Sequence, residues 1–156
     1  MVPPFFLFLL AADPRVETAR ANWAALDRGT HCDAVSQSLL VPPKGQQQPF
    51  VTLSFDRSGG RKGQLAVRFK RPVRAGSSVM IIIGDQPFQL VAQGPFAWSR
   101  GPAQEIAILD AMRFATIMKV DARDAAGRRM VDRYALSGAP TAIDAAAACA
   151  ARLAKR

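Results

Sequence analysis

The sequence predicts a mainly β domain, an antiparallel β-sandwich or partly open barrel with two short helices, the last at the C-terminus. Three observations predict it. Short runs of alternating apolar and polar residues recur between turns rich in Gly and Pro. The spacing of apolar residues becomes helical in only two places. The chain of 156 residues, 49% of them hydrophobic, suits one domain with a buried core.

The clearest hairpin is predicted over residues 50–70. Its two strands each have one apolar face, formed by Val51, Leu53, Phe55, Leu65, Val67 and Phe69. The intervening segment 56–63 contains three glycines, which can adopt the positive φ that tight turns require. We expect Arg68 and Lys70 on the outer face of this hairpin and Arg61 and Lys62 at its tip.

The chain before this hairpin is less regular. Residues 13–22 are expected to be a polar lead-in, and the first strand is expected to begin at Trp23. A second strand is predicted within 32–41, with Val35, Leu39 and Val41 on its core side.

After the hairpin, the unbroken apolar run 79–83 indicates a strand covered on both faces. Short strands are predicted over 88–92 and 96–98. Helical spacing over 102–114, with Pro102 in the first turn, predicts a helix.

A second hairpin is predicted from strands at 116–123 and 130–136. The chain then enters a last helix through Ser137–Thr141. One apolar stripe on that helix consists of Ile143, Ala146, Ala147, Ala150, Leu153 and Ala154, and Cys149 lies near its edge.

Residues 1–12 carry an apolar run that is too short to span a bilayer but fits the core of a secretory signal. A buried N-terminal strand is the alternative. The expected organisation is therefore a signal-like segment over 1–12, a lead-in over 13–22 and one β-rich domain over 23–156. We expect a periplasmic or secreted protein with no transmembrane span.

The only two cysteines are Cys32 and Cys149. An even count in an exported chain indicates one disulfide, which here would tie an early strand to the last helix. Two buried free thiols in a cytosolic protein are the alternative.

Residue types for catalysis and metal binding are sparse. The single histidine, His31, precedes Cys32, and neighbouring residues of a strand face opposite ways. A zinc site needs three or four suitably spaced ligands, which we do not find. Asp121, Asp124 and Asp132 are interpreted as turn-forming and solvated carboxylates. We expect no catalytic residues, no metal and no cofactor; an enzyme that uses carboxylates alone is the other reading, without a feature in its favour.

Positive charge is concentrated in one segment of this basic chain, whose net charge is +9. Such a charge favours anionic partners, and we expect an anionic component of the envelope or surface. The candidate anion-binding residues are Arg57, Arg61, Lys62, Arg68, Lys70, Arg71 and Arg74. Protection of strand edges and faces is the alternative role. A second basic group comprises Arg123, Arg128, Arg129 and Arg133.

A nucleic-acid partner is disfavoured, because single-strand binding needs aromatic side chains among the cations. Phe55 and Phe69 are predicted to face the core instead.

The segment 106–149 has a recognisable order: Ile-Leu-Asp-Ala-Met-Arg at 108–113, a strand, and Asp-Arg-Tyr-Ala-Leu-Ser-Gly-Ala-Pro-Thr-Ala-Ile at 132–143 before the helix with Cys149. It resembles the invasion-associated locus B family of bacterial envelope proteins. Residues that fit the family outline are Trp23, Cys32, Leu136, Gly138, Thr141 and Cys149. Ala139-Pro140 replaces the family's usual Phe, and a second cysteine pair often found mid-chain is missing.

The resemblance implies an exported β-sandwich-like domain and brings no catalytic residues. We therefore expect a non-catalytic exported domain that acts by binding. The alternative is a cytosolic basic module that binds nucleic acid.

Overall fold

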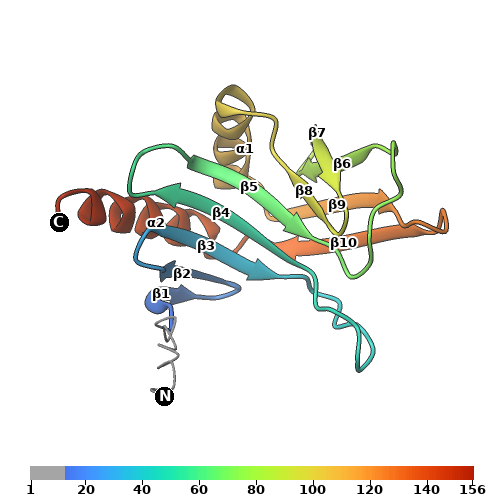
Figure 1. Cartoon of the computed structure of the whole chain (residues 1–156), viewed down its shortest axis with the longest axis horizontal. Helices are drawn as coiled ribbons and strands as arrows, with labels where there is room; N and C mark the ends of the chain where they lie inside the picture. The colour runs from blue at the N-terminus through green and yellow to red at the C-terminus, as the bar shows by residue number, and fades with distance from the viewer. Residues whose placement is uncertain (1–12) are drawn as a thin grey trace, which may run out of the picture.

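In residues 13–156, ten strands are hydrogen-bonded into one antiparallel sheet, in the order β1-β2-β3-β4-β5-β8-β7-β6-β9-β10. The structure, a computed structural model, describes residues 13–156, so the signal-like segment 1–12 lies outside the described residues (Figure 1). The strands are β1 Arg15–Arg20, β2 Trp23–Asp27, β3 His31–Gln37, β4 Phe50–Asp56, β5 Lys62–Arg68, β6 Val79–Ile83, β7 Gln86–Gln93, β8 Phe96–Trp98, β9 Ile117–Arg123 and β10 Arg129–Ala135. The helices are α1 Pro102–Phe114 and α2 Ala139–Ala154.

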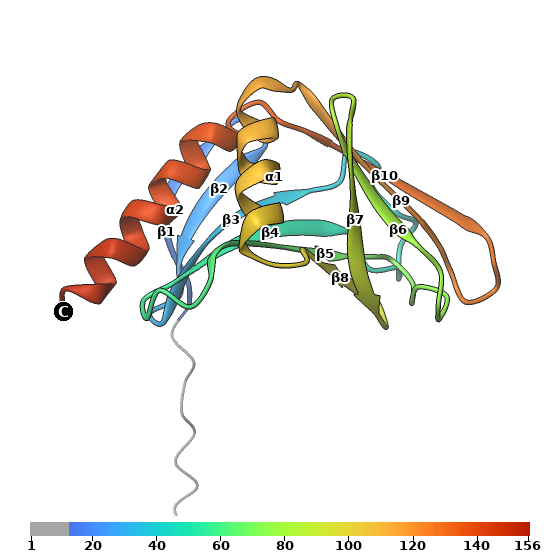
Figure 2. The same ribbon diagram turned by 90° about the horizontal axis from the view of Figure 1, so that it is seen from above.

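The sheet curls until its two ends approach each other, which gives the predicted sandwich-like, partly closed shape (Figure 2). The amide of Leu39, just after β3, donates to the carbonyl of Arg133 in β10 at 2.8 Å. The indole Nε1 of Trp23 in β2 donates to the carbonyl of Ala135 at 2.9 Å. The predicted fold class is confirmed.

The core lies inside this curl. The alternation predicted for β4 and β5 is confirmed: Val51, Leu53, Leu65 and Val67 are fully buried and Phe55 is 9% exposed. Facing them, β6, β9 and β10 contribute Ile81, Met118, Met130 and Tyr134. Helix α1 covers β5 with Ile108 and Met112, whereas α2 lies along β1–β4 (Figure 2).

Two expectations for the N-terminal part were wrong. Most of the supposed lead-in 13–22 forms β1, an edge strand whose Val16 is 60% exposed, so it has no buried face that alternation could reveal. In β3, Val35 faces outward, while Leu39 and Val41 lie beyond the strand and are exposed. The core side carries the small residues Cys32, Ala34 and Ser36, because α2 packs against this face.

The later elements follow the predictions closely. Helix α1 has the predicted bounds, strand β9 begins one residue later than predicted, and β9 pairs with β10 as a hairpin. The run 79–83 is buried on one face only, since Met80 and Ile82 are half-buried on the other. On α2, Ala147 is half-buried and Ala154 exposed, whereas Cys149 belongs to the buried stripe.

The disulfide joins β3 to α2. Cys32 and Cys149 are bonded across a sequence separation of 117 residues, and both are almost completely buried. At the other end of the helix, Gly138 has φ +89°, and a Cβ there would collide with the carbonyl oxygen of Arg20. The chain can therefore turn into α2 this close to β1 only with glycine at that position.

Within residues 13–156, neither helix has the length and apolar character needed to cross a membrane. A buried disulfide is typical of proteins that reside outside the reducing cytosol.

Candidate anion-binding site

The turn between β4 and β5 is built around one carboxylate. Asp56 accepts hydrogen bonds from the Arg61 backbone amide and from Arg61 Nε, each at 2.9 Å. These bonds, chiefly the side-chain bond, lower the pKa of Asp56 against the opposing effect of partial burial. Gly59, with φ +78°, lets the chain reverse within the turn. The ion pair thus fixes the base of the turn and leaves its outer cations projecting.

A hollow of about 470 Å³ lies beside this turn, next to the end of α2. Its lining residues are Thr30, His31, Asp56, Arg57, Ser58, Arg61 and Ala154. Arg57 is held there, because its backbone amide donates to Thr30 O at 3.0 Å and its guanidinium donates to Arg156 O at 2.9 Å. A smaller adjoining hollow of about 220 Å³ is lined partly by Lys62. The structure thus brings together Arg57, Arg61 and Lys62.

Hydroxyl and imidazole groups accompany these cations. The hydroxyl of Thr30 lies 3.0 Å from Nδ1 of His31, and Ser58 lines the same hollow from the turn. Guanidinium and ammonium groups beside hydroxyls form a donor set that suits phosphate or sulfate oxygens. Thr30 and His31 were not predicted for this site, because only folding places the start of β3 beside the turn. Ser58 was predicted only as part of the turn.

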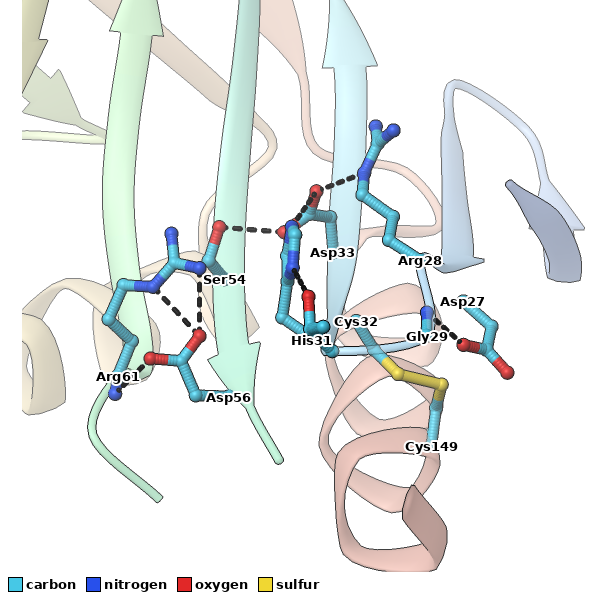
Figure 3. Close-up of polar contacts among 11 residues, drawn as sticks. Asp27, Arg28, Gly29, His31, Cys32, Asp33, Ser54, Asp56, Arg61 and Cys149 are labelled. Carbon is cyan, nitrogen blue, oxygen red and sulfur yellow. Dashed lines mark hydrogen bonds and ion pairs between the residues drawn. A yellow bond between two sulfur atoms is a disulfide. The ribbon is translucent and has the colours of Figure 1, made fainter. Parts of the chain in front are cut away.

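A second polar cluster lies on the outer face of β3 and β4 (Figure 3). Buried Asp33 accepts from Ser54 Oγ at 2.7 Å and from Arg28 Nε at 2.5 Å, and His31 Nε2 lies 3.6 Å away. Although serine, histidine and aspartate meet here, the Ser54 hydroxyl donates to the carboxylate and not to the imidazole. This arrangement orients the serine without a base to activate it, unlike a catalytic triad.

The remaining predicted cations lie elsewhere. Arg68 lies on the outer face of the sheet with its guanidinium carbon 4.9 Å from the ring centroid of Phe96. Arg71 pairs with Asp124 at 2.8 Å, and Arg74 approaches Gly127 in the β9–β10 turn. Lys70 acts electrostatically on Asp132. Three of the seven predicted residues therefore meet at the β4–β5 turn. The others lie on the outer face (Arg68), at the end of the β9–β10 hairpin (Arg71 and Arg74) and near Asp132 (Lys70).

That hairpin end also carries the second basic group. Buried Asp124 organises its turn by accepting from the amides of Ala126 and Arg128 and from two guanidinium groups. Burial alone would raise the pKa of Asp124, but these hydrogen bonds and charges lower it overall. Arg129 pairs with Asp121. Much of the positive charge here is already neutralised, which makes this group a weaker anion site than the β4–β5 turn.

Asp121, Asp124 and Asp132 do not converge. Asp132 points into the core, where it is 3% exposed, and its Oδ2 has no hydrogen-bond partner among the described residues. Burial raises the pKa of Asp132 despite the nearby charges of Lys70 and Arg71. Its description as a solvated carboxylate was therefore wrong, because β10 places it on the same face as Met130 and Tyr134.

In residues 13–156, one group of possible metal ligands lies within 4.8 Å: Asp27, Cys32 and Cys149. The two sulfurs are bonded to each other. A disulfide offers no thiolate, so this group does not form a cation site in the oxidised protein.

The outer face of the sheet has two features that the sequence analysis missed. Phe96 and Trp98 stack with ring centroids 5.9 Å apart, beside Arg68. An open hollow of about 710 Å³ is lined by Ala24, Val35, Phe50 and nine further residues of β1–β4 and their loops, together with Arg28. Strand β8 has only three residues, too few for alternation to show which side its aromatic rings face.

Comparison with known proteins finds no matching family model, no similar curated protein and no similar solved structure.

Proposed function

We propose that this chain is a non-catalytic exported domain, of the invasion-associated locus B type, that acts by binding anionic groups at the β4–β5 turn. The observation that carries this proposal is the hollow in which Arg57 and Arg61 meet Thr30, His31 and Ser58, with Lys62 at its margin. The ligand groups with matching chemistry are phosphates and sulfates of envelope or surface components.

Electrostatics support this location. Arg57 is exposed at the hollow, and Lys62 has no carboxylate within ion-pair distance in the part of the chain described here. Asp56 neutralises one cation, Arg61, so the turn keeps a net positive charge. The chain's net charge of +9 adds a long-range attraction for polyanions.

The test is a charge reversal at the two outer cations, Arg57→Glu with Lys62→Glu. We expect affinity for a heparin hexasaccharide, or for inorganic polyphosphate, to fall by more than about tenfold, which is 1.4 kcal/mol. The two probes distinguish sulfate from phosphate ligands. The matched control is Arg20→Glu with Arg100→Glu, two exposed cations outside the hollow that change the net charge equally. If both double variants lose affinity equally, the loss results from net charge alone, and the proposed site is refuted.

The proposed compartment has its own test. The intact mass of the protein purified from its own cell, without reduction, should lack the first dozen or so residues, and both cysteines should resist alkylation until they are reduced. A full-length mass with two reactive thiols would contradict export.

A cytosolic nucleic-acid-binding module remains the second candidate, and one observation favours it. The stacked pair Phe96–Trp98 beside Arg68 is an aromatic platform of the kind on which the bases of single-stranded nucleic acids stack. This reading predicts binding of an oligothymidylate that weakens steeply with salt and is lost in Trp98→Ala. The disulfide argues against it, because the cytosol keeps thiols reduced.

A further inference from the structure

We infer that the loop between β3 and β4 is a membrane-inserting tip that docks this domain on an anionic lipid surface. The loop presents three consecutive large apolar residues to solvent: Leu39, Leu40 and Val41 are 52%, 66% and 81% exposed. In Figure 1 it projects beyond the ends of the two strands, away from the helices. The inference is independent of the proposed anion site, which lies at the opposite ends of these two strands.

Hydrogen bonds hold the base of this loop in place. Ser38 is buried; its amide donates to Pro49 O at 3.0 Å and its hydroxyl donates to Leu40 O at 2.9 Å. Gln48 Nε2 donates to Ser38 Oγ at 2.8 Å. Pro42 and Pro43 then restrict the backbone between these residues and the outer turn of the loop, where the Gln46 amide donates to Pro43 O at 3.1 Å. The three apolar side chains are thus held outward on an ordered support, so their exposure does not result from a frayed segment.

The charge around the tip matches an anionic surface. Residues 34–55 contain no Asp or Glu, and their one charged residue is Lys44, which is exposed. Arg133, whose carbonyl binds the Leu39 amide, is exposed beside the base of the loop, and it lies opposite Lys119 in the β9–β10 register. Of the two acids in these strands, Asp132 is buried and Asp121 pairs with Arg129.

A lipid surface fits these features better than a protein partner does. The loop exposes three large apolar side chains next to β3, of which Leu39 also lines the open hollow on the outer face. Three such side chains cover less area than a stable protein interface buries. Insertion into a bilayer interface needs no complementary shape. It gains from a small apolar area together with attraction of cations to anionic headgroups.

Co-sedimentation with vesicles tests the inference on the disulfide-bonded protein. We expect binding to POPC/POPG 3:1 vesicles to exceed binding to POPC vesicles. The double variant Leu40→Asp with Val41→Asp should weaken POPC/POPG binding by about tenfold or more. The control is Ile106→Asp with Phe114→Asp, which adds the same two negative charges at apolar positions of α1 that are 63% and 89% exposed. It should bind as the native protein does.

A second measurement reports insertion directly. Compared with the native protein, Leu40→Trp should show an added emission shift to shorter wavelength when POPC/POPG vesicles are present, and brominated lipids should quench it. Absence of native binding to these vesicles, retention of binding by the double aspartate variant, or an unshifted emission of the Leu40→Trp variant would each overturn the inference. If the native protein self-associates, the double aspartate variant is monomeric and both bind vesicles equally, the loop is a protein interface instead.

Discussion

Reduction of the disulfide should destabilise this domain about as much as a large cavity in its core would, because the bond constrains most of the unfolded chain. Cys32 and Cys149 are 117 residues apart, and the chain-entropy model converts a loop of that length into about 5 kcal/mol. This value is an upper limit, since residual structure in the unfolded chain reduces it to about 2–4 kcal/mol in many proteins. Both sulfurs are buried, so the reduced thiols keep most of their packing.

The assay is urea unfolding followed by circular dichroism, with and without a phosphine reductant. We expect the free energy of unfolding to fall by at least about 2 kcal/mol on reduction. The control is the double variant Cys32→Ala with Cys149→Ala, whose unfolding should not respond to the reductant. A native protein whose stability is also unchanged would show that the two thiols are free, and would refute the reasoning on compartment.

Two further predictions follow from strained and buried positions. In thermal unfolding, Gly138→Ala should destabilise the protein clearly more than Gly76→Ala. Both residues have positive φ, which costs an alanine about 1–2 kcal/mol, but only at Gly138 would the added Cβ collide with the Arg20 carbonyl. Equal losses would show that α2 does not start against β1. Asp132→Asn should stabilise the protein at pH 7 by about 1 kcal/mol, because it removes an unpaired buried carboxylate. Burial raises the folded-state pKa of Asp132, so the native protein loses about this much stability as pH rises from about 4 through the folded-state pKa. At lower pH, where Asp132 is protonated, the native protein and the variant should be equally stable. A difference that persists at pH 3 would contradict the assigned cause.

The elements that sequence reasoning located were those with one clearly buried face. In β5, Leu65 and Val67 alternate with polar or small residues because one side packs on the core. The bounds of α1 followed from Pro102 and the helical spacing after it. Local pattern and tertiary packing agree at these places, so the prediction needs no knowledge of distant contacts.

The failures have a common physical origin in contacts between distant segments. Strand β3 was assigned the wrong core face because α2, more than a hundred residues later, selects small side chains at Ala34 and Ser36. The candidate site was predicted only in part. Its cations were predicted from the local density of positive charge in the sequence, whereas the hollow depends on the contact of Arg57 with Arg156, 99 residues away. Alternation within a strand carries no information about such contacts.

An NMR titration of the disulfide-bonded, isotopically labelled protein with a heparin hexasaccharide tests directly whether anions bind at the β4–β5 turn. We expect the largest amide shifts at residues 56–62, at Thr30 and His31, and at the end of α2, with smaller shifts at residues 123–133. Shifts confined to residues 123–133, or spread evenly over exposed Arg and Lys, would contradict a binding site at the β4–β5 turn.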